Sequence, residues 1–287
     1  MGLLWLVTLG WAFSFSLIGV YLSGQVDDYV SVLIRTALAS LLFVPVMARR
    51  WPGALLVTKL MAIGGIQIGL MYIFFFRSFA YLSVPEVLLF TILTPLYITL
   101  FDELIERRLH LPLRWWLASL LAVAGAAVIR WNGIDSGAMF GFFLVQGANV
   151  CFALGQVAYK RLDLGSIPDQ IRDFGFFFLG GTLVALVAAL VLADWSKMPE
   201  GHVAWGVLLW LGLGASGLGY LGWNSGARLV NTAQLAVMNN MLIPFGILVN
   251  VVIWNRDADW VRLVIGGAIL AGAIVLASRG PRSVRTS

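Results

Sequence analysis

The chain contains one cysteine, two histidines and few charged residues. Cys151 lies in an apolar stretch, so we expect neither a disulfide framework nor a cysteine-rich metal site. His110 and His202 fall in predicted connections, which excludes a paired-histidine metal site. Charged residues make up 11% of the chain, against roughly 25% in an average soluble domain. This composition does not fit a soluble protein.

The sequence also has no motif of nucleotide or hydrolytic chemistry. It contains no glycine-rich phosphate loop with a lysine, no H-E-x-x-H motif and no G-x-S-x-G motif. No apolar stretch offers both a serine and a histidine as a nucleophile–base pair. We therefore expect neither an enzyme nor an ATP-driven pump, and no cofactor.

Apolar residues, by contrast, make up 60% of the chain. A membrane-spanning helix needs about 20 mainly apolar residues, and in lipid it must satisfy its own backbone hydrogen bonds. Ten stretches meet this requirement, and short connections with glycine or proline separate them. The prediction is an all-α polytopic membrane protein with helices at 2–23, 30–48, 54–79, 85–102, 113–131, 137–159, 174–193, 204–226, 231–253 and 260–278.

The last five stretches repeat features of the first five. Because each repeat has an odd number of spans, the second repeat has the opposite orientation in the bilayer. Many secondary transporters are built in this way and bind their substrate between the two halves. We predict one repeat at 1–135, an inverted repeat at 136–279, a central cavity between them, and a cytoplasmic tail at 280–287. The matching features are Tyr81-Leu82-Ser83, Thr94-Pro95 and Ala124-Gly125-Ala126 in the first repeat, and Leu229-Val230-Asn231-Thr232, Ile243-Pro244 and Ala271-Gly272-Ala273 in the second.

Lysine and arginine residues concentrate on one predicted side of the membrane. With the N-terminus inside, thirteen basic residues lie on the cytoplasmic side and four outside. This asymmetry predicts a multi-pass protein of the inner membrane with both termini cytoplasmic. The net charge of +5 is then a topology signal, so no nucleic-acid partner is expected. The expected partners are the lipid bilayer and a small-molecule substrate; the oligomeric state stays open.

Two of the charged residues inside predicted spans, Arg35 and Glu86, are candidates for the cavity, because charge is costly in the membrane and usually faces a cavity. Arg35 is either a cavity cation that meets a substrate carboxylate, or an arginine that snorkels outward or holds a neighbouring helix. Glu86 follows Pro85 and is either an ordinary helix-start acid or a protonatable group for proton coupling.

Uncharged polar and aromatic residues at mid-span depth are further candidates for substrate binding. Most tryptophans lie near helix ends, as in an interfacial belt, and Trp11 and Trp223 are exceptions. The alternative for the amides is that they form hydrogen bonds between helices. The candidate substrate-binding residues are Trp11, Ser14, Gln67, Tyr72, Gln146, Asn149, Trp223, Asn224 and Asn239.

In order and spacing, several short motifs resemble the EamA-like branch of the drug/metabolite transporter superfamily. They include Gly10-Trp11 with Ser14, Arg35, Thr94-Pro95, Glu106-Arg107-Arg108 and Trp223-Asn224. The resemblance covers nearly the whole chain and implies a ten-helix exporter made of two five-helix repeats. One departure is Asn255-Arg256-Asp257, where the family often has a Gly-Glu-Arg-like motif.

The sequence therefore predicts a secondary transporter that exports a small amphipathic metabolite by alternating access, with an amino acid as the expected cargo. Another solute class, such as a nucleotide sugar or a drug-like cation, is the alternative. A non-transporting membrane scaffold or receptor is a third possibility, which a sealed core would favour.

The distribution of basic residues gives the first testable prediction. Reporter fusions at Ser287 and after Lys59 should report a cytoplasmic location, and a fusion after Asp28 should report an external one. An external Ser287 would mean an odd number of spans and would contradict the inverted repeat.

Overall fold

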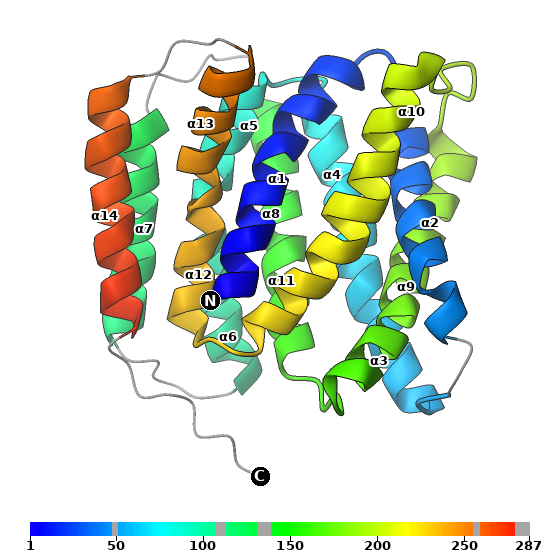
Figure 1. The fold of residues 1–287 in the computed structure, drawn as a ribbon, viewed down its shortest axis with the longest axis horizontal. Coiled ribbons are helices and arrows are strands. Elements are labelled where there is room, and N and C mark those ends of the chain that lie inside the picture. Colours follow the sequence, from blue (N-terminus) through cyan, green and yellow to red (C-terminus); the bar gives the residue numbers. More distant parts are fainter. Residues whose placement is uncertain (48–50, 107–112, 131–138, 255–258, 279–287) are drawn as a thin grey trace.

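The computed structural model describes residues 1–47, 51–106, 113–130, 139–254 and 259–278. Over these ranges the chain is helical, with short connecting turns and no strand. Nine of the described helical units are long and apolar enough to cross a membrane, and Leu113–Val128 is a shorter apolar helix. The helices stand side by side in one bundle (Figure 1), so the predicted all-α membrane fold is confirmed.

The described helices group into ten spans, numbered one to ten along the chain. Spans three, four, eight and nine are each built from more than one helical segment. In chain order the spans are α1 (Gly2–Tyr21); α2 (Asp28–Met47); α3 (Ala54–Gly64), η1 (Gly65–Leu70) and α4 (Met71–Ser78); α5 (Val84–Phe90), η2 (Thr91–Leu93) and α6 (Thr94–Glu106); α7 (Leu113–Arg130); α8 (Met139–Lys160); α9 (Ile167–Leu192); α10 (Gly201–Leu209), η4 (Trp210–Leu218) and α11 (Gly219–Ala227); α12 (Thr232–Asn240) and α13 (Leu242–Trp254); and α14 (Trp260–Ser278).

The seventh span begins earlier than the sequence predicted. The predicted start at residue 174 is wrong because Ser166 and Asp169 form a capping box that starts α9 at Ile167. The helix therefore includes Asp173, a buried acid that the sequence prediction had left outside the span.

The interruptions of the helices recur at matching places in the two halves. Span three contains the π-helical segment η1, and span eight contains the π-helical segment η4. Span four is broken at η2, and span nine is broken at Met241. Each broken span also begins with a capping box, formed by Ser83 with Glu86 and by Asn231 with Gln234. Local structure thus repeats after five spans.

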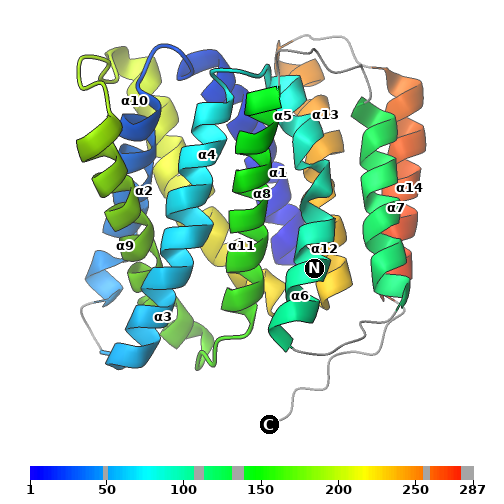
Figure 2. The same ribbon diagram turned by 180° about the vertical axis from the view of Figure 1, so that it is seen from behind.

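Packing between the spans has the same two-fold relation. Spans two and seven (α2 and α9) pack together, as do spans five and ten (α7 and α14) and spans four and nine (α6 and α12). The contact of span three with span six (α4 with α8) is mirrored by that of span eight with span one (α11 with α1). Figures 1 and 2 show α7 and α14 at one edge of the bundle and α2 and α9 at the other. The fold is therefore the predicted inverted repeat.

The start of α1 and the end of α14 lie toward the same end of the bundle. In Figure 1, α1 begins and α14 ends in the lower half of the view, as an even number of crossings requires. Which face of the membrane this end meets stays a prediction. The predicted tail at 280–287, the Arg107-Arg108 pair, His110 and the Asn255-Arg256-Asp257 segment lie outside the described residues.

Span three packs against α9 by direct contact of the two backbones. A Cβ atom on Gly64 would overlap the carbonyl oxygen of Phe177, and one on Gly180 would overlap the carbonyl oxygen of Met61. Small residues at such positions allow close approach of helices in lipid. This contact joins the first half of the chain to the second.

Replacing Gly64 with alanine tests that contact. The added methyl group should force the backbones apart and lower the free energy of unfolding by about 1–3 kcal/mol, the usual cost of overpacking. Gly272→Ala is the matched control, because a Cβ there has no neighbour within 4 Å. The melting temperature in detergent should fall for Gly64→Ala only; equal melting temperatures would contradict the close contact.

Candidate functional site

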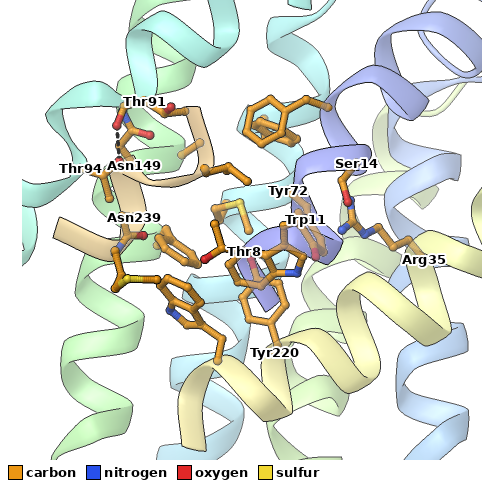
Figure 3. A pocket seen from close by; sticks show the side chains of 18 residues that line it. Thr8, Trp11, Ser14, Arg35, Tyr72, Thr91, Thr94, Asn149, Tyr220 and Asn239 are labelled. Carbon is orange, nitrogen blue, oxygen red and sulfur yellow. Dashed lines mark hydrogen bonds between the residues drawn. The ribbon is translucent and has the colours of Figure 1, made fainter. Parts of the chain in front are cut away.

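A cavity lies between the two halves, lined by residues from spans one, two, three, four, six, eight and nine. Its volume is about 100 Å³, several times the roughly 10–15 Å³ that one water molecule needs. Figure 3 shows the lining side chains. They are Thr8, Trp11, Ser14, Phe15, Arg35, Met71, Tyr72, Phe75, Thr91, Thr94, Ala148, Asn149, Phe152, Tyr220, Trp223, Met238, Asn239 and Leu242.

The guanidinium of Arg35 marks one end of the cavity. The side chain is only 3% exposed, and its Nε donates a hydrogen bond to Ser216 Oγ at 2.6 Å. The Tyr72 ring centre lies 4.0 Å from Arg35 Cζ, a cation–π contact. Arg35 Nη1 is buried without a hydrogen-bond partner, and no carboxylate of the described residues pairs with this side chain. An arginine cannot lose its proton to relieve this, so the free donor favours an anionic ligand.

The π-helical segment η4 positions the partners of Arg35. Ser216 lies in η4, and its hydroxyl is also 2.7 Å from Tyr72 Oη. Trp11 Nε1 donates to the carbonyl oxygen of Ala215 at 2.7 Å, so η4 also anchors the first span. Single π-helical turns are frequent at functional sites, and here the irregular segment connects the arginine to the aromatic wall.

Four aromatic side chains form the middle of the cavity. The Trp11 and Trp223 rings stack with centroids 5.0 Å apart and an angle of 30° between their planes. Tyr220 lies 4.8 Å from the Trp11 ring, and Phe152 lies 6.0 Å from it. Trp223 Nε1 donates to Gln156 Oε1 at 2.9 Å, which fixes the indole. These rings offer flat apolar faces to an organic solute.

Uncharged polar groups lie at the end of the cavity away from Arg35. Figure 3 shows Thr91, Thr94, Asn149 and Asn239 together on one side of the aromatic residues, and Arg35 with Ser14 on the other. The cavity therefore has a cationic end and a neutral polar end, with an aromatic wall between them.

Seven of the eleven candidate residues from the sequence line this cavity. Arg35 was chosen for its charge inside a span, and the others are polar or indole side chains that are costly to leave facing lipid. They are Trp11, Ser14, Arg35, Tyr72, Asn149, Trp223 and Asn239.

The structure places Gln67, Asn224, Gln146 and Glu86 away from the cavity lining. Gln67 and Asn224 are fully buried, and their amides bond to each other, Nε2 to Oδ1 at 3.1 Å. Gln146 Nε2 donates to the Phe90 carbonyl at 3.1 Å. The Glu86 carboxylate accepts from the backbone N–H of Ser83 at 2.7 Å, as a helix-start residue does. Their roles in binding or coupling therefore stay predictions.

Most of the lining residues that the sequence analysis missed are apolar or threonine. Such residues look the same in a sequence whether they face lipid, core or cavity. The internal repeat did contain a signal for Tyr220, because Gly69-Leu70-Met71-Tyr72 matches Gly217-Leu218-Gly219-Tyr220. Each tyrosine is the second residue after a π-helical segment, in α4 and in α11. The missed residues are Thr8, Phe15, Met71, Phe75, Thr91, Thr94, Ala148, Phe152, Tyr220, Met238 and Leu242.

Comparisons with known proteins agree with this architecture. The model of the EamA-like transporter family matches residues 139–278. A Pseudomonas aeruginosa protein named probable biotin transporter is 48% identical over 285 residues, 97% of this chain and 98% of that protein. The chain belongs to the EamA-like transporter family. Proteins named biotin transporter from Salmonella typhimurium and Escherichia coli K12 are 43% and 42% identical, over 100% of this chain and 96% of theirs.

A solved crystal structure shares the fold of this EamA-like protein, with a TM-score of 0.73 and 19% sequence identity, covering 96% of each chain. The EamA-like chain is thus a multi-pass membrane transporter of a small metabolite. The comparisons do not support the amino acid expected from the sequence, because the named relatives are biotin transporters.

The Gln67–Asn224 pair tests whether hydrogen bonds between buried amides stabilise the packing of η1 against α11. Gln67→Leu and Asn224→Leu should each destabilise the protein, because each leaves a buried amide without its partner. The double variant should lose less stability than the two single variants together, by about 0.6 kcal/mol, the average measured for such hydrogen bonds between membrane helices. Unfolding in a denaturing detergent measures this difference, and strictly additive losses would contradict the bracing role.

Proposed function

We propose that this protein is a secondary transporter of biotin or a solute of the same kind, an organic carboxylate with a hydrogen-bonding ring. The observation that carries the proposal is Arg35, whose Nη1 is a buried donor without a partner at the wall of an aromatic cavity. Biotin has a carboxylate on a short alkyl chain, and a carboxylate is the acceptor that a guanidinium binds best. The names of the relatives support the same cargo.

Charge balance favours this cargo over an amino acid. An α-amino acid would bring an ammonium group next to its carboxylate, and no aspartate or glutamate is among the described residues that line the cavity. A drug-like cation would meet the positive charge of Arg35, and a nucleotide sugar would have one lining arginine for its two phosphates. A sealed core would have favoured a scaffold or receptor, and the cavity between the inverted halves favours a transporter instead. Amino-acid export remains the competing function.

The mechanism that we propose is alternating access in the inner membrane, with both termini cytoplasmic. The two inverted halves would rock about the cavity and open it to one side of the membrane at a time. At the end where α1 and α2 meet, Asp28 and Arg77 form an ion pair at 3.2 Å. At the opposite end, Asp102 pairs with Arg161 between α6 and α8. The Asp28–Arg77 pair lies within the first half, whereas the Asp102–Arg161 pair joins the two halves, so we expect the second pair to break when its end of the cavity opens.

Replacing Arg35 tests the carboxylate assignment. A hydrogen bond to a charged group is worth about 1.5–3 kcal/mol, so Arg35→Gln should raise the KM for biotin roughly 10- to 100-fold. Wild-type protein should prefer biotin over its uncharged amide, and Arg35→Gln should remove this preference. Arg35→Lys keeps the charge but not the planar fork, so its KM should lie between the two.

The measurement is uptake of labelled biotin into proteoliposomes, with the amide and an amino-acid panel as competitors. Lys197→Gln is the control for a general charge effect, since this exposed lysine lies in the turn between α9 and α10. A retained preference for biotin over its amide in Arg35→Gln would contradict the assignment. If the protein transports amino acids but not biotin, the result would support amino-acid export as its function.

A further inference from the structure

The neutral end of the cavity presents mainly hydrogen-bond acceptors, because most of its side-chain donors already bond within the protein. Asn149 Nδ2 donates both of its hydrogens, to the Phe90 carbonyl at 2.9 Å and to Gln146 Oε1 at 3.2 Å. The hydroxyl of Thr91 donates to the Leu88 carbonyl at 2.8 Å, and that of Thr94 donates to the Thr91 carbonyl at 2.7 Å. Their donors are therefore used within the protein.

What these groups still offer to a ligand follows from their chemistry. A hydroxyl has one hydrogen and two lone pairs, and a carboxamide oxygen has two lone pairs. Thr91, Thr94 and Asn149 thus have free acceptor oxygens on the cavity wall. Asn239 Nδ2 donates one hydrogen to the Leu235 carbonyl at 2.8 Å, which leaves its oxygen and one N–H. The set contains several acceptors and one remaining donor.

The orientation of both amides is determined by their partners. A backbone carbonyl only accepts hydrogen bonds, so the atom that faces Phe90 or Leu235 must be the NH₂ group. The oxygens of Asn149 and Asn239 are therefore the atoms left without a donor among the described residues. No lining residue at this end is charged.

We propose that Thr91, Thr94, Asn149 and Asn239 form a subsite for a cyclic urea or cyclic amide of the cargo. The ring N–H groups donate to the acceptor oxygens, and the ring carbonyl accepts from the free N–H of Asn239. This inference deepens the proposed function and rests on it for the carboxylate end. The cargo then lies with its carboxylate at Arg35, its apolar part against Trp11 and its ring at Asn239.

This subsite explains selection by shape as well as by charge. The cationic and neutral ends lie on opposite sides of the aromatic wall (Figure 3). An α-amino acid has its ammonium and carboxylate on one carbon, so these two groups cannot occupy the two ends at once. A fatty acid reaches Arg35 but leaves the acceptor oxygens without a donor, which costs binding free energy. A solute with N–H groups far from its carboxylate satisfies both ends.

The test compares biotin with an analogue in which a methyl group replaces one ring N–H hydrogen. Competition with labelled biotin uptake in proteoliposomes gives the ratio of the two inhibition constants. Because a neutral hydrogen bond contributes about 1 kcal/mol, the wild-type ratio should be at least about fivefold. In the Thr94→Val/Asn239→Leu double variant the ratio should fall toward one. Both side chains form hydrogen bonds only to the backbone of their own span, so their replacement removes no hydrogen bond between helices.

Asn240→Leu is the matched control. Asn240 is the neighbour of Asn239, but it is buried, donates to the carbonyls of Ile92 and Ala122, and does not line the cavity. This variant should lower stability and keep the wild-type ratio.

The outcomes separate this inference from the function on which it rests. A wild-type ratio near one overturns the subsite, and this result needs no variant to fold. An unchanged ratio in the double variant, with biotin uptake retained, also overturns the subsite and leaves the biotin transporter standing. Absence of biotin uptake by the wild-type protein overturns the proposed function and the subsite together.

Discussion

A break in a membrane-spanning helix leaves backbone carbonyls without partners, and lipid cannot supply them. Spans four and nine are both broken, and Pro95 and Pro244 remove further backbone donors there. The carbonyl of Phe90 instead accepts from two amide side chains of α8, and the carbonyl of Ile92 accepts from Asn240 of α12. These amides come from the second half of the chain, so the broken span of the first half depends on its inverted partner. This dependence lets polar groups face a cavity in mid-membrane.

The same constraint determines the character of the cavity. Asn149 Nδ2 donates its hydrogens to the Phe90 carbonyl at the break in span four and to Gln146 Oε1. Only the side-chain oxygen of Asn149 is then left for a ligand at the neutral end of the cavity. At the other end η4 holds Ser216 and Ala215, which position Arg35 and Trp11. A buried guanidinium without a carboxylate is costly in lipid, and the proposed carboxylate-bearing cargo would remove that cost during transport. Weak contacts along the aromatic wall would then allow release after the halves rearrange.

The sequence alone predicted the inverted repeat and most of the polar cavity residues, because charge and depth are visible in a single span. It could not divide the amides between cavity and helix contacts. Gln146 and Asn149 share one face of α8 and the same carbonyl partner, yet only Asn149 also lines the cavity. That difference depends on the rotation of α8 against the broken span four, which periodicity does not contain. The amino-acid cargo expected from the sequence would need an acidic partner for its ammonium group, and the absence of one among the described lining residues became visible only in the folded structure.

The structure of the protein with biotin bound in lipid nanodiscs tests the account most directly. We expect the carboxylate about 2.7–2.9 Å from the Arg35 guanidinium, the distance of a charge-assisted hydrogen bond, and the ring at Asn149 and Asn239. Biotin in the reverse orientation, or bound outside the cavity with Arg35 still unpaired, would contradict it.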